Sequence, residues 1–151
     1  MMAPKDAAVS FLKMVVQGDI RAAYDRYVDP NCVCHNPYFG FRPEELRAGM
    51  EANHQQFPKK SYEALRAVAE GDLVAVHGRV QLAADVPVIA VVHLFRFANG
   101  RIVELWDVGQ AVPADSPNTR GMFYRRCFST SCAMPKRKKP VALFRRMPSV
   151  R

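Results

Sequence analysis

Hydrophobic residues in the first 56 positions recur every three or four residues, which is the spacing of amphipathic helices. They predict one helix that ends at Gly18 and a second helix that Asp19 can cap and that Asp29-Pro30-Asn31 stops. A third helix is expected to begin at Pro43, because proline is favoured in a first helical turn, and to run to about Gln56. The apolar stripes of the first two helices are Ala8, Phe11, Leu12 and Val15 and then Ile20, Ala23, Tyr24 and Tyr27.

From residue 61 the pattern changes from helical spacing to the alternation of strands. The expected strands are 61–69, 73–82, 87–97 and 101–111, and residues 32–36 form a further short extended piece. The last two strands are joined by Asn99-Gly100, a strong signal for a tight hairpin. Three helices followed by a four-strand meander indicate an α+β domain whose sheet curls around the helices.

Composition then divides the chain into two unequal parts. The 151 residues are 49% hydrophobic, enough for one domain to bury a core without disulfides or a structural metal. The net charge is +8, but residues 124–151 hold nine cations and no anion, so residues 1–123 carry a net charge of −1. We therefore expect a domain over 1–123 and a basic, disordered tail over 124–151, with nucleic-acid binding possible only through that tail.

Several classes of protein are disfavoured by what the sequence lacks. The four cysteines do not have zinc-site spacing, and no glycine-rich phosphate loop is present, so no metal and no cofactor are expected. No signal peptide is predicted, because the first residues lack a charged head followed by a long apolar stretch. The longest apolar run, from Val86 to Phe95, is broken by Pro87 and His93, so no membrane span is predicted and a cytoplasmic location is expected.

Candidate chemistry lies on the last two predicted strands. Alternation places His93 on one face with Ile89, Val91, Phe95 and Phe97, and Asp107 on one face with Val103, Leu105 and Gly109. If these faces are both inward, His93 and Asp107 meet across adjacent strands. A poorly solvated carboxylate is a good proton acceptor, and a neutral histidine beside it can hydrogen-bond to it or to a substrate oxygen. Such a pair can equally be a self-satisfied part of a core.

Four further residues are candidates for binding a substrate. If the sheet curls around the helices as expected, His35 and Asn36 lie at the mouth of a cavity, and His77 could line that cavity or sit at its rim. Trp106 lies on the face opposite Asp107 if the strand is regular, although a bulge would exchange the two faces.

Three segments resemble proteins of the SnoaL-like polyketide cyclase family, which belongs to the nuclear transport factor 2-like superfamily. They are His35-Asn36-Pro37, the hairpin from Phe95 to Gln110 with its Trp-Asp-Val-x-Gln ending, and the segment from Asn118 to Phe123. This resemblance, which extends over residues 5–123, implies a cone-shaped α+β fold with a curled antiparallel sheet packed on three N-terminal helices. It also implies a homodimer built through the sheet.

The resemblance also suggests a function. Characterised SnoaL-type cyclases resemble this chain in pairing a histidine and an aspartate on the last two strands, which suggests His93 and Asp107 as catalytic residues. The implied activity is cofactor-free proton abstraction from a small apolar carbonyl compound, as in an aldol cyclase or isomerase. A non-catalytic small-molecule-binding protein of the same fold is the alternative. Two positions depart from many relatives, which carry Asp where this chain has His93 and His where it has Leu105.

Overall fold

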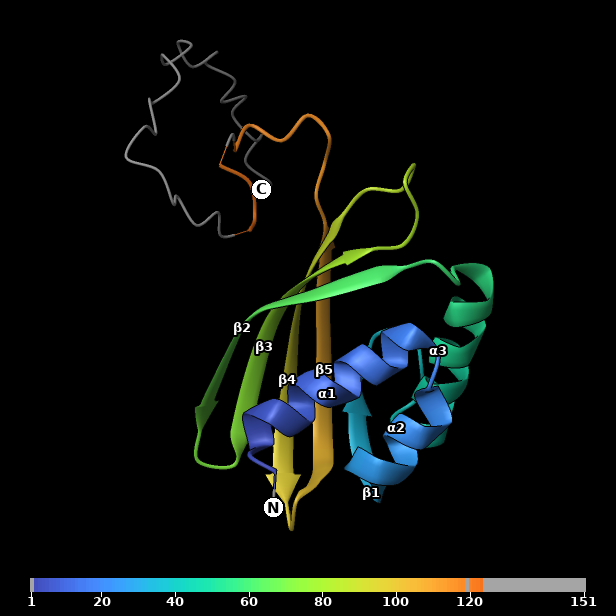
Figure 1. Cartoon of the computed structure of the whole chain (residues 1–151), viewed down its shortest axis with the longest axis vertical. Helices are drawn as coiled ribbons and strands as arrows, with labels where there is room; N and C mark the ends of the chain where they lie inside the picture. The colour runs from blue at the N-terminus through green and yellow to red at the C-terminus, as the bar shows by residue number, and fades with distance from the viewer. Residues whose placement is uncertain (1, 119, 124–151) are drawn as a thin grey trace, which may run out of the picture.

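Three helices pack against the inner face of one curled five-stranded sheet (Figure 1). The computed structural model describes residues 2–118 and 120–123, so the predicted tail lies outside the described residues. The elements are α1 Pro4–Gln17, α2 Ile20–Tyr27, β1 Val28–His35, α3 Pro43–Gln56, β2 Ser61–Glu70, β3 Leu73–Gln81, β4 Ile89–Ala98 and β5 Arg101–Ala111. The α+β class with a curled sheet, expected from the sequence, is thereby confirmed.

The helices begin and end close to the predicted positions. Gly18 closes α1 in the left-handed conformation (φ 97°), where its backbone N–H donates to the last carbonyls of the helix. Asp19 occupies the N-cap position of α2, but its side chain makes no capping hydrogen bond, so that detail of the prediction is wrong. Helix α2 then passes at Val28 directly into β1, with Asp29 and Pro30 already in the strand.

The sheet contains one strand more than the predicted meander. Its order is β1-β5-β4-β3-β2, and β1 pairs parallel to β5 whereas the other neighbours are antiparallel. Cys32 and Cys34 are buried on the inner face of β1, while Val33 between them is exposed. The expected short extended piece is therefore the end of an eight-residue edge strand.

The β4–β5 hairpin turns at Asn99 (φ 52°) and Gly100 (φ 77°), as the Asn-Gly pair predicts. Just beyond the turn the register shifts, because Arg96 lies opposite Glu104 but Phe97 lies opposite Ile102. This bulge puts Ile102 into the core in place of Val103, which corrects the expected face of Val103. From Glu104 onward the predicted alternation holds.

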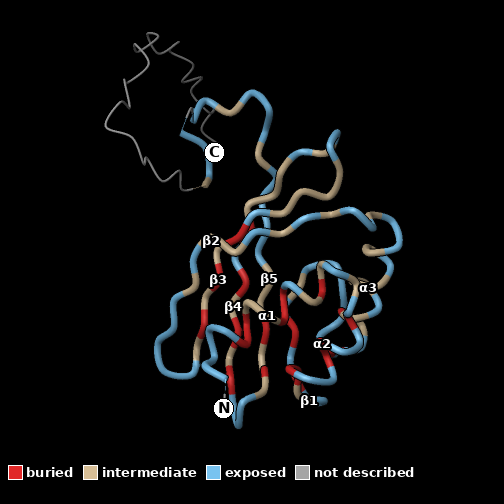
Figure 2. The backbone as a smooth tube through the Cα atoms, viewed as in Figure 1, coloured by how far each residue is buried: buried red, intermediate tan, exposed pale blue. Residues whose placement is uncertain are grey.

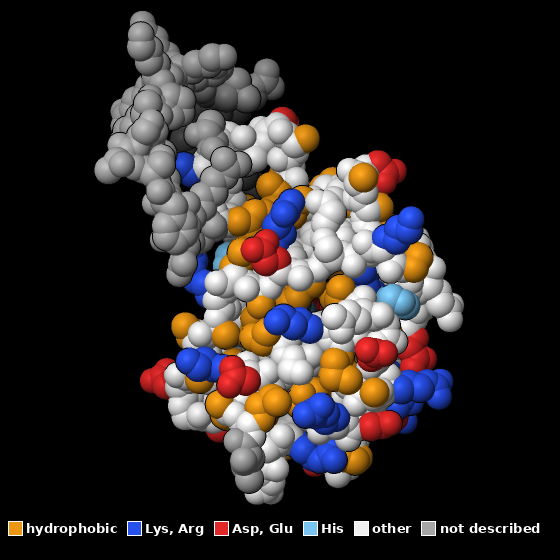
Figure 3. Space-filling model, viewed as in Figure 1, with side chains coloured by type: hydrophobic (Ala, Val, Ile, Leu, Met, Phe, Trp, Pro, Cys, Tyr) orange, Lys and Arg blue, Asp and Glu red, His pale blue; other side chains and the backbone are white. Residues whose placement is uncertain are grey.

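The core lies between α1, α2 and the centre of the sheet. Figure 2 shows buried segments along the helices and through the middle of β3, β4 and β5. Phe11 of α1 contacts Phe95 edge-to-face, with ring centroids 5.9 Å apart, and contacts Tyr24 of α2 at 5.5 Å. On the surface that carries α1, charges of both signs are interspersed with hydrophobic side chains (Figure 3). Within the described part of the chain, no helix is long and apolar enough to cross a membrane.

Candidate functional site

A cavity of about 550 Å³ lies between the inner face of the sheet, helices α1 and α3, and residues 36–39. Most of its lining is apolar, with side chains such as Leu12, Val15 and Met50 from the helices and Ile89 and Val91 from β4. This volume and lining are typical of a small-molecule site. Another hollow of about 560 Å³, beside α2 and β1, has a more charged lining and does not reach His93 or Asp107.

His93 and Asp107 lie directly opposite each other on β4 and β5, and both line the cavity. His93 Nε2 is 3.5 Å from Asp107 Oδ1, and the two side chains are 11% and 27% exposed. Burial lowers the pKa of His93, and the negative charge of Asp107 opposes this shift only in part, which keeps the imidazole neutral at pH 7. His93 Nδ1 is also buried, and no described residue hydrogen-bonds to it.

Asn36 fixes the Asp107 carboxylate from the other side. Its Nδ2 donates to Asp107 Oδ2 at 2.9 Å, and its Oδ1 accepts from the backbone N–H of Tyr38 at 2.8 Å. Both the nitrogen and the oxygen of the Asn36 amide therefore form hydrogen bonds within the protein. Although Asn36 lines the cavity, its contacts are those of a residue that positions Asp107 and not those of a free substrate ligand.

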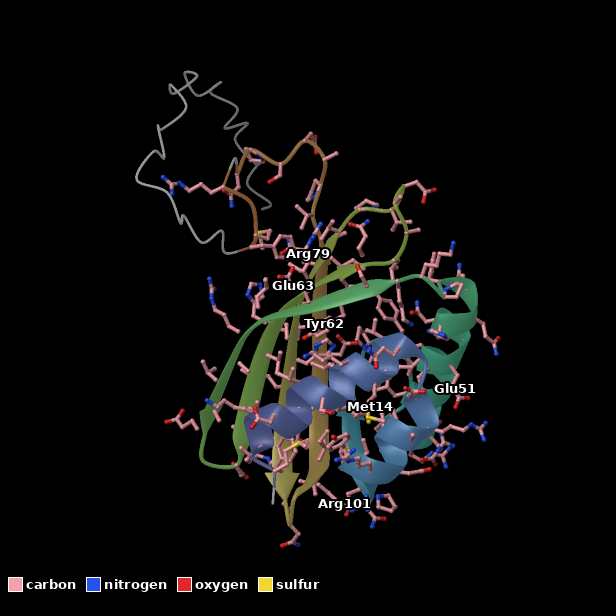
Figure 4. All side chains as sticks on the ribbon, viewed as in Figure 1. Met14, Glu51, Tyr62, Glu63, Arg79 and Arg101 are labelled. Atoms are coloured by element: carbon pink, nitrogen blue, oxygen red, sulfur yellow. The ribbon has the colours of Figure 1, made fainter. Side chains whose placement is uncertain are left out.

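Tyr62 is a polar group of the cavity that the sequence reasoning missed. It lies between β2 and α1 (Figure 4), and its ring contacts His93 edge-on with centroids 6.2 Å apart. The hydroxyl is buried without a hydrogen-bond partner among the described residues, and burial raises its pKa to about 12. Gly78 leaves the space for this ring, because a Cβ there would lie 2.5 Å from Tyr62 Cε2. A glycine inside a strand is the one sequence signal for such a close approach.

The other candidates lie on the outer face of the sheet and do not line the cavity. His35 stacks on Trp106 with ring centroids 4.9 Å apart, and its Nε2 is 2.9 Å from a carboxylate oxygen of Glu104. His77 stacks on Phe123 at 6.3 Å. The structure thus brings together three of the six predicted site residues, His93, Asp107 and Asn36, and separates them from His35, His77 and Trp106.

No metal site is evident in the part of the chain that the structure describes, where no three His, Cys, Asp or Glu side chains cluster. Cys32 and Cys34 are free and buried. A hydrogen bond with Cys34, together with burial, raises the pKa of the Cys32 thiol. The absence of a cofactor stays a prediction.

Comparison with known proteins agrees with this geometry. A family model described as SnoaL-like domain matches residues 8–105. The chain belongs to the SnoaL-like family. No curated protein matches its sequence. The match includes His93, while Asp107 lies two residues past its end.

Solved structures share the fold of this SnoaL-like domain. The putative hydroxylase AclR from Streptomyces galilaeus is 21% identical with a TM-score of 0.61, over 70% of this chain and 87% of that one. IdmH, a putative polyketide cyclase from Streptomyces antibioticus, is 19% identical with a TM-score of 0.59, over 72% and 93%. A SnoaL-like polyketide cyclase from Agrobacterium tumefaciens is 16% identical with a TM-score of 0.58, over 73% and 93%. At these identities the likeness extends to the fold alone.

Proposed function

We propose that this SnoaL-like domain is a cofactor-independent enzyme that abstracts a proton next to a carbonyl group, as an aldol cyclase or isomerase does. The observation that carries the proposal is the setting of the Asp107 carboxylate. It stands on the wall of a largely apolar cavity, with one oxygen held by Asn36 and the other 3.5 Å from His93. The substrate class is a small, largely apolar carbonyl compound. The fold shared with two proteins whose names describe polyketide cyclases supports this assignment.

In the proposed reaction, Asp107 accepts a proton from the carbon beside the carbonyl, and the electron pair of that C–H bond forms an enolate. Neutral His93 orients Asp107 or donates to the enolate oxygen. Tyr62 is a second donor, since a hydroxyl with a pKa of about 12 stays protonated at neutral pH. In a cyclisation the enolate carbon then attacks a second carbonyl of the same molecule, and the alkoxide that forms takes the proton back from Asp107. In an isomerisation Asp107 returns the proton to a different carbon. Neither route consumes a cofactor.

The test is the Asp107→Asn variant, which keeps the shape of the side chain and an oxygen that can accept from Asn36. Exchange of the acidic C–H protons of methyl ketones for deuterium, followed by NMR, reports the first step without knowledge of the natural substrate. We expect Asp107→Asn to slow exchange by about 100-fold or more, the usual contribution of a general base. Asp85→Asn, which alters an exposed loop carboxylate, is the control. Wild-type exchange rates in Asp107→Asn would refute the assignment.

The second candidate is a non-catalytic binding protein that uses the same cavity. One observation favours it: the 3.5 Å separation of His93 and Asp107 exceeds the usual length of a hydrogen bond, about 2.7–3.2 Å, so the pair is not tightly coupled. In that case neither the wild type nor Asp107→Asn would catalyse exchange, although both would bind the ketone.

The proposed assembly is a homodimer through the outer face of the sheet, in the cytoplasm. Four valines, each on a different strand, are exposed on that face, namely Val33, Val68, Val92 and Val108. Contact with nucleic acid would require the basic residues of 124–151.

A further inference from the structure

Lys60 lies at the opposite end of the cavity from the His93–Asp107 pair. Tyr62, Val80, Ile89 and Ala111 form one row across the sheet, and Lys60 is two residues before Tyr62. His93 and Asp107 form another row, four residues farther along β4. At about 3.3 Å per residue the backbones of the two rows are about 13 Å apart along β4. The cavity extends between them, and the Tyr62 ring reaches from its own row to His93. Ala111 is exposed, so the cavity reaches solvent at this end, as it also does beside Asn36, where Tyr38 and Phe39 are exposed.

The Lys60 ammonium has no anionic partner. Its Nζ donates to Asn53 Oδ1 at 2.7 Å, but this amide is neutral and satisfies one of three N–H donors. Among the described residues no carboxylate forms an ion pair with Lys60, and it is the one Lys or Arg that lines the cavity. Partial burial lowers its pKa, because the charge is poorly solvated there. A bound anion would restore the missing solvation.

We propose that the ligand of this cavity carries a carboxylate that pairs with Lys60, while its carbonyl end reaches Asp107 and His93. This inference rests on the proposed function and narrows its substrate class to elongated keto acids with an apolar middle. A single ammonium with one neutral neighbour suits a singly charged group such as a carboxylate. A phosphate would call for more donors or a bidentate arginine.

The experiment compares two probes with the same aromatic body, of which one ends in a negative charge and the other in a neutral ester. They are acetylbiphenyl carboxylate, with its acetyl and carboxylate groups at opposite para positions, and the methyl ester of the same acid. Calorimetry gives the Kd of each probe for the full chain, and NMR follows deuterium exchange at the acetyl methyl group. The wild type should bind the carboxylate about ten-fold more tightly than the ester, as expected for a charge-assisted hydrogen bond at a partly exposed site.

Two matched lysine variants then test whether Lys60 causes the preference for the carboxylate over the ester. Lys60→Met should remove the preference for the carboxylate and leave the Kd of the ester unchanged. Lys59→Met removes the same charge from the neighbouring residue, which is exposed and does not line the cavity, and should keep the preference. Equal binding of the two probes by the wild type, binding of neither probe, or loss of the preference in both variants would each overturn the inference.

The same data separate this inference from the proposed function. Methyl exchange that depends on Asp107, without a preference for the carboxylate, would leave the enzyme assignment standing and reject the role of Lys60. A preference that depends on Lys60, without exchange, would support a keto-acid site and favour the binding-protein alternative. The exchange rate and the ratio of the two Kd values are first measured on the wild type, and the Asp107→Asn and Lys60→Met variants then assign them to these residues.

Discussion

Replacing Gly78 by alanine tests the contact that holds Tyr62 over the sheet. A Cβ at Gly78 would lie 2.5 Å from Cε2, 2.7 Å from the hydroxyl oxygen and 2.8 Å from Cζ of Tyr62. Ordinary contacts of a Cβ begin at 3.4 Å, so the ring must move by about 1 Å. Gly109 on β5 provides a matched control on the same cavity, since a Cβ there would meet Ile89 at 3.4 Å and Val91 at 3.6 Å.

The expected change in the free energy of unfolding has two parts of opposite sign. Alanine restricts the unfolded chain more than glycine does, which stabilises the fold by roughly 0.4–1 kcal/mol at a compatible position. Neither Gly78 nor Gly109 has a positive φ, so alanine is compatible with the backbone and gives this stabilisation at both positions. Overpacking costs about 1–3 kcal/mol, and only Gly78 incurs it. We therefore expect Gly109→Ala to be neutral or slightly stabilising and Gly78→Ala to destabilise the domain by about 1–2 kcal/mol.

Denaturant unfolding of the full chain measures these differences, and a double-mutant cycle assigns them to Tyr62. In a Tyr62→Leu background the far half of the ring is absent, so Gly78→Ala should lose most of its cost and give a coupling of about 1–2 kcal/mol. The reasoning fails if Gly78→Ala is tolerated as well as Gly109→Ala. It also fails if the cost persists undiminished beside Tyr62→Leu, because the clash would then involve another group.

The positions of His93 and Asp107 could be predicted because they depend on local rules. Asn99-Gly100 fixes a two-residue hairpin, and strict alternation then decides which side chains share a face. The bulge at Val103 was not predictable in the same way. Ile102 and Val103 are both β-branched and apolar, so either one can face the core, and the choice depends on packing across the whole sheet.

Two other features of the sheet could not be predicted, because they depend on residues far apart in the sequence. Strand β1 pairs with β5, more than sixty residues later, and a parallel pair has no turn of its own that would reveal it in the sequence. The sequence could not show whether His77 of β3 faces the core. Leu73 and Ala75, which share its face, are as apolar as Val74 and Val76 on the other face. The structure resolves this, since only Val74 and Val76 are buried.

Lys60, another polar group of the cavity, was beyond sequence reasoning for a different reason. Lys60 follows a Phe-Pro turn among other polar residues, where a charged side chain is ordinarily solvated. Its position in the cavity depends on how α3 meets the curled end of β2. Asn36 was predicted to be near the site, but its role required the hydrogen bond to Asp107.

Two further measurements test the outer face and the electrostatics of the site. Val108→Asp places a charge on a residue that is 61% exposed in one chain. It should convert a sedimenting dimer to monomer and lower Tm to a value that no longer depends on protein concentration, because dimerisation stabilises the folded chain. A wild type that is monomeric at micromolar concentration would contradict the assembly. Burial lowers the pKa of His93, so between that pKa and about 6.5 the unfolded chain binds a proton that the folded domain does not. The free energy of unfolding should therefore fall as the pH falls below about 6.5, by at most about 1.4 kcal/mol per pH unit from this residue. His93→Gln should flatten that slope in denaturant unfolding between about pH 7 and pH 5.5, and an unchanged slope would mean that His93 is protonated as easily in the folded domain as in the unfolded chain.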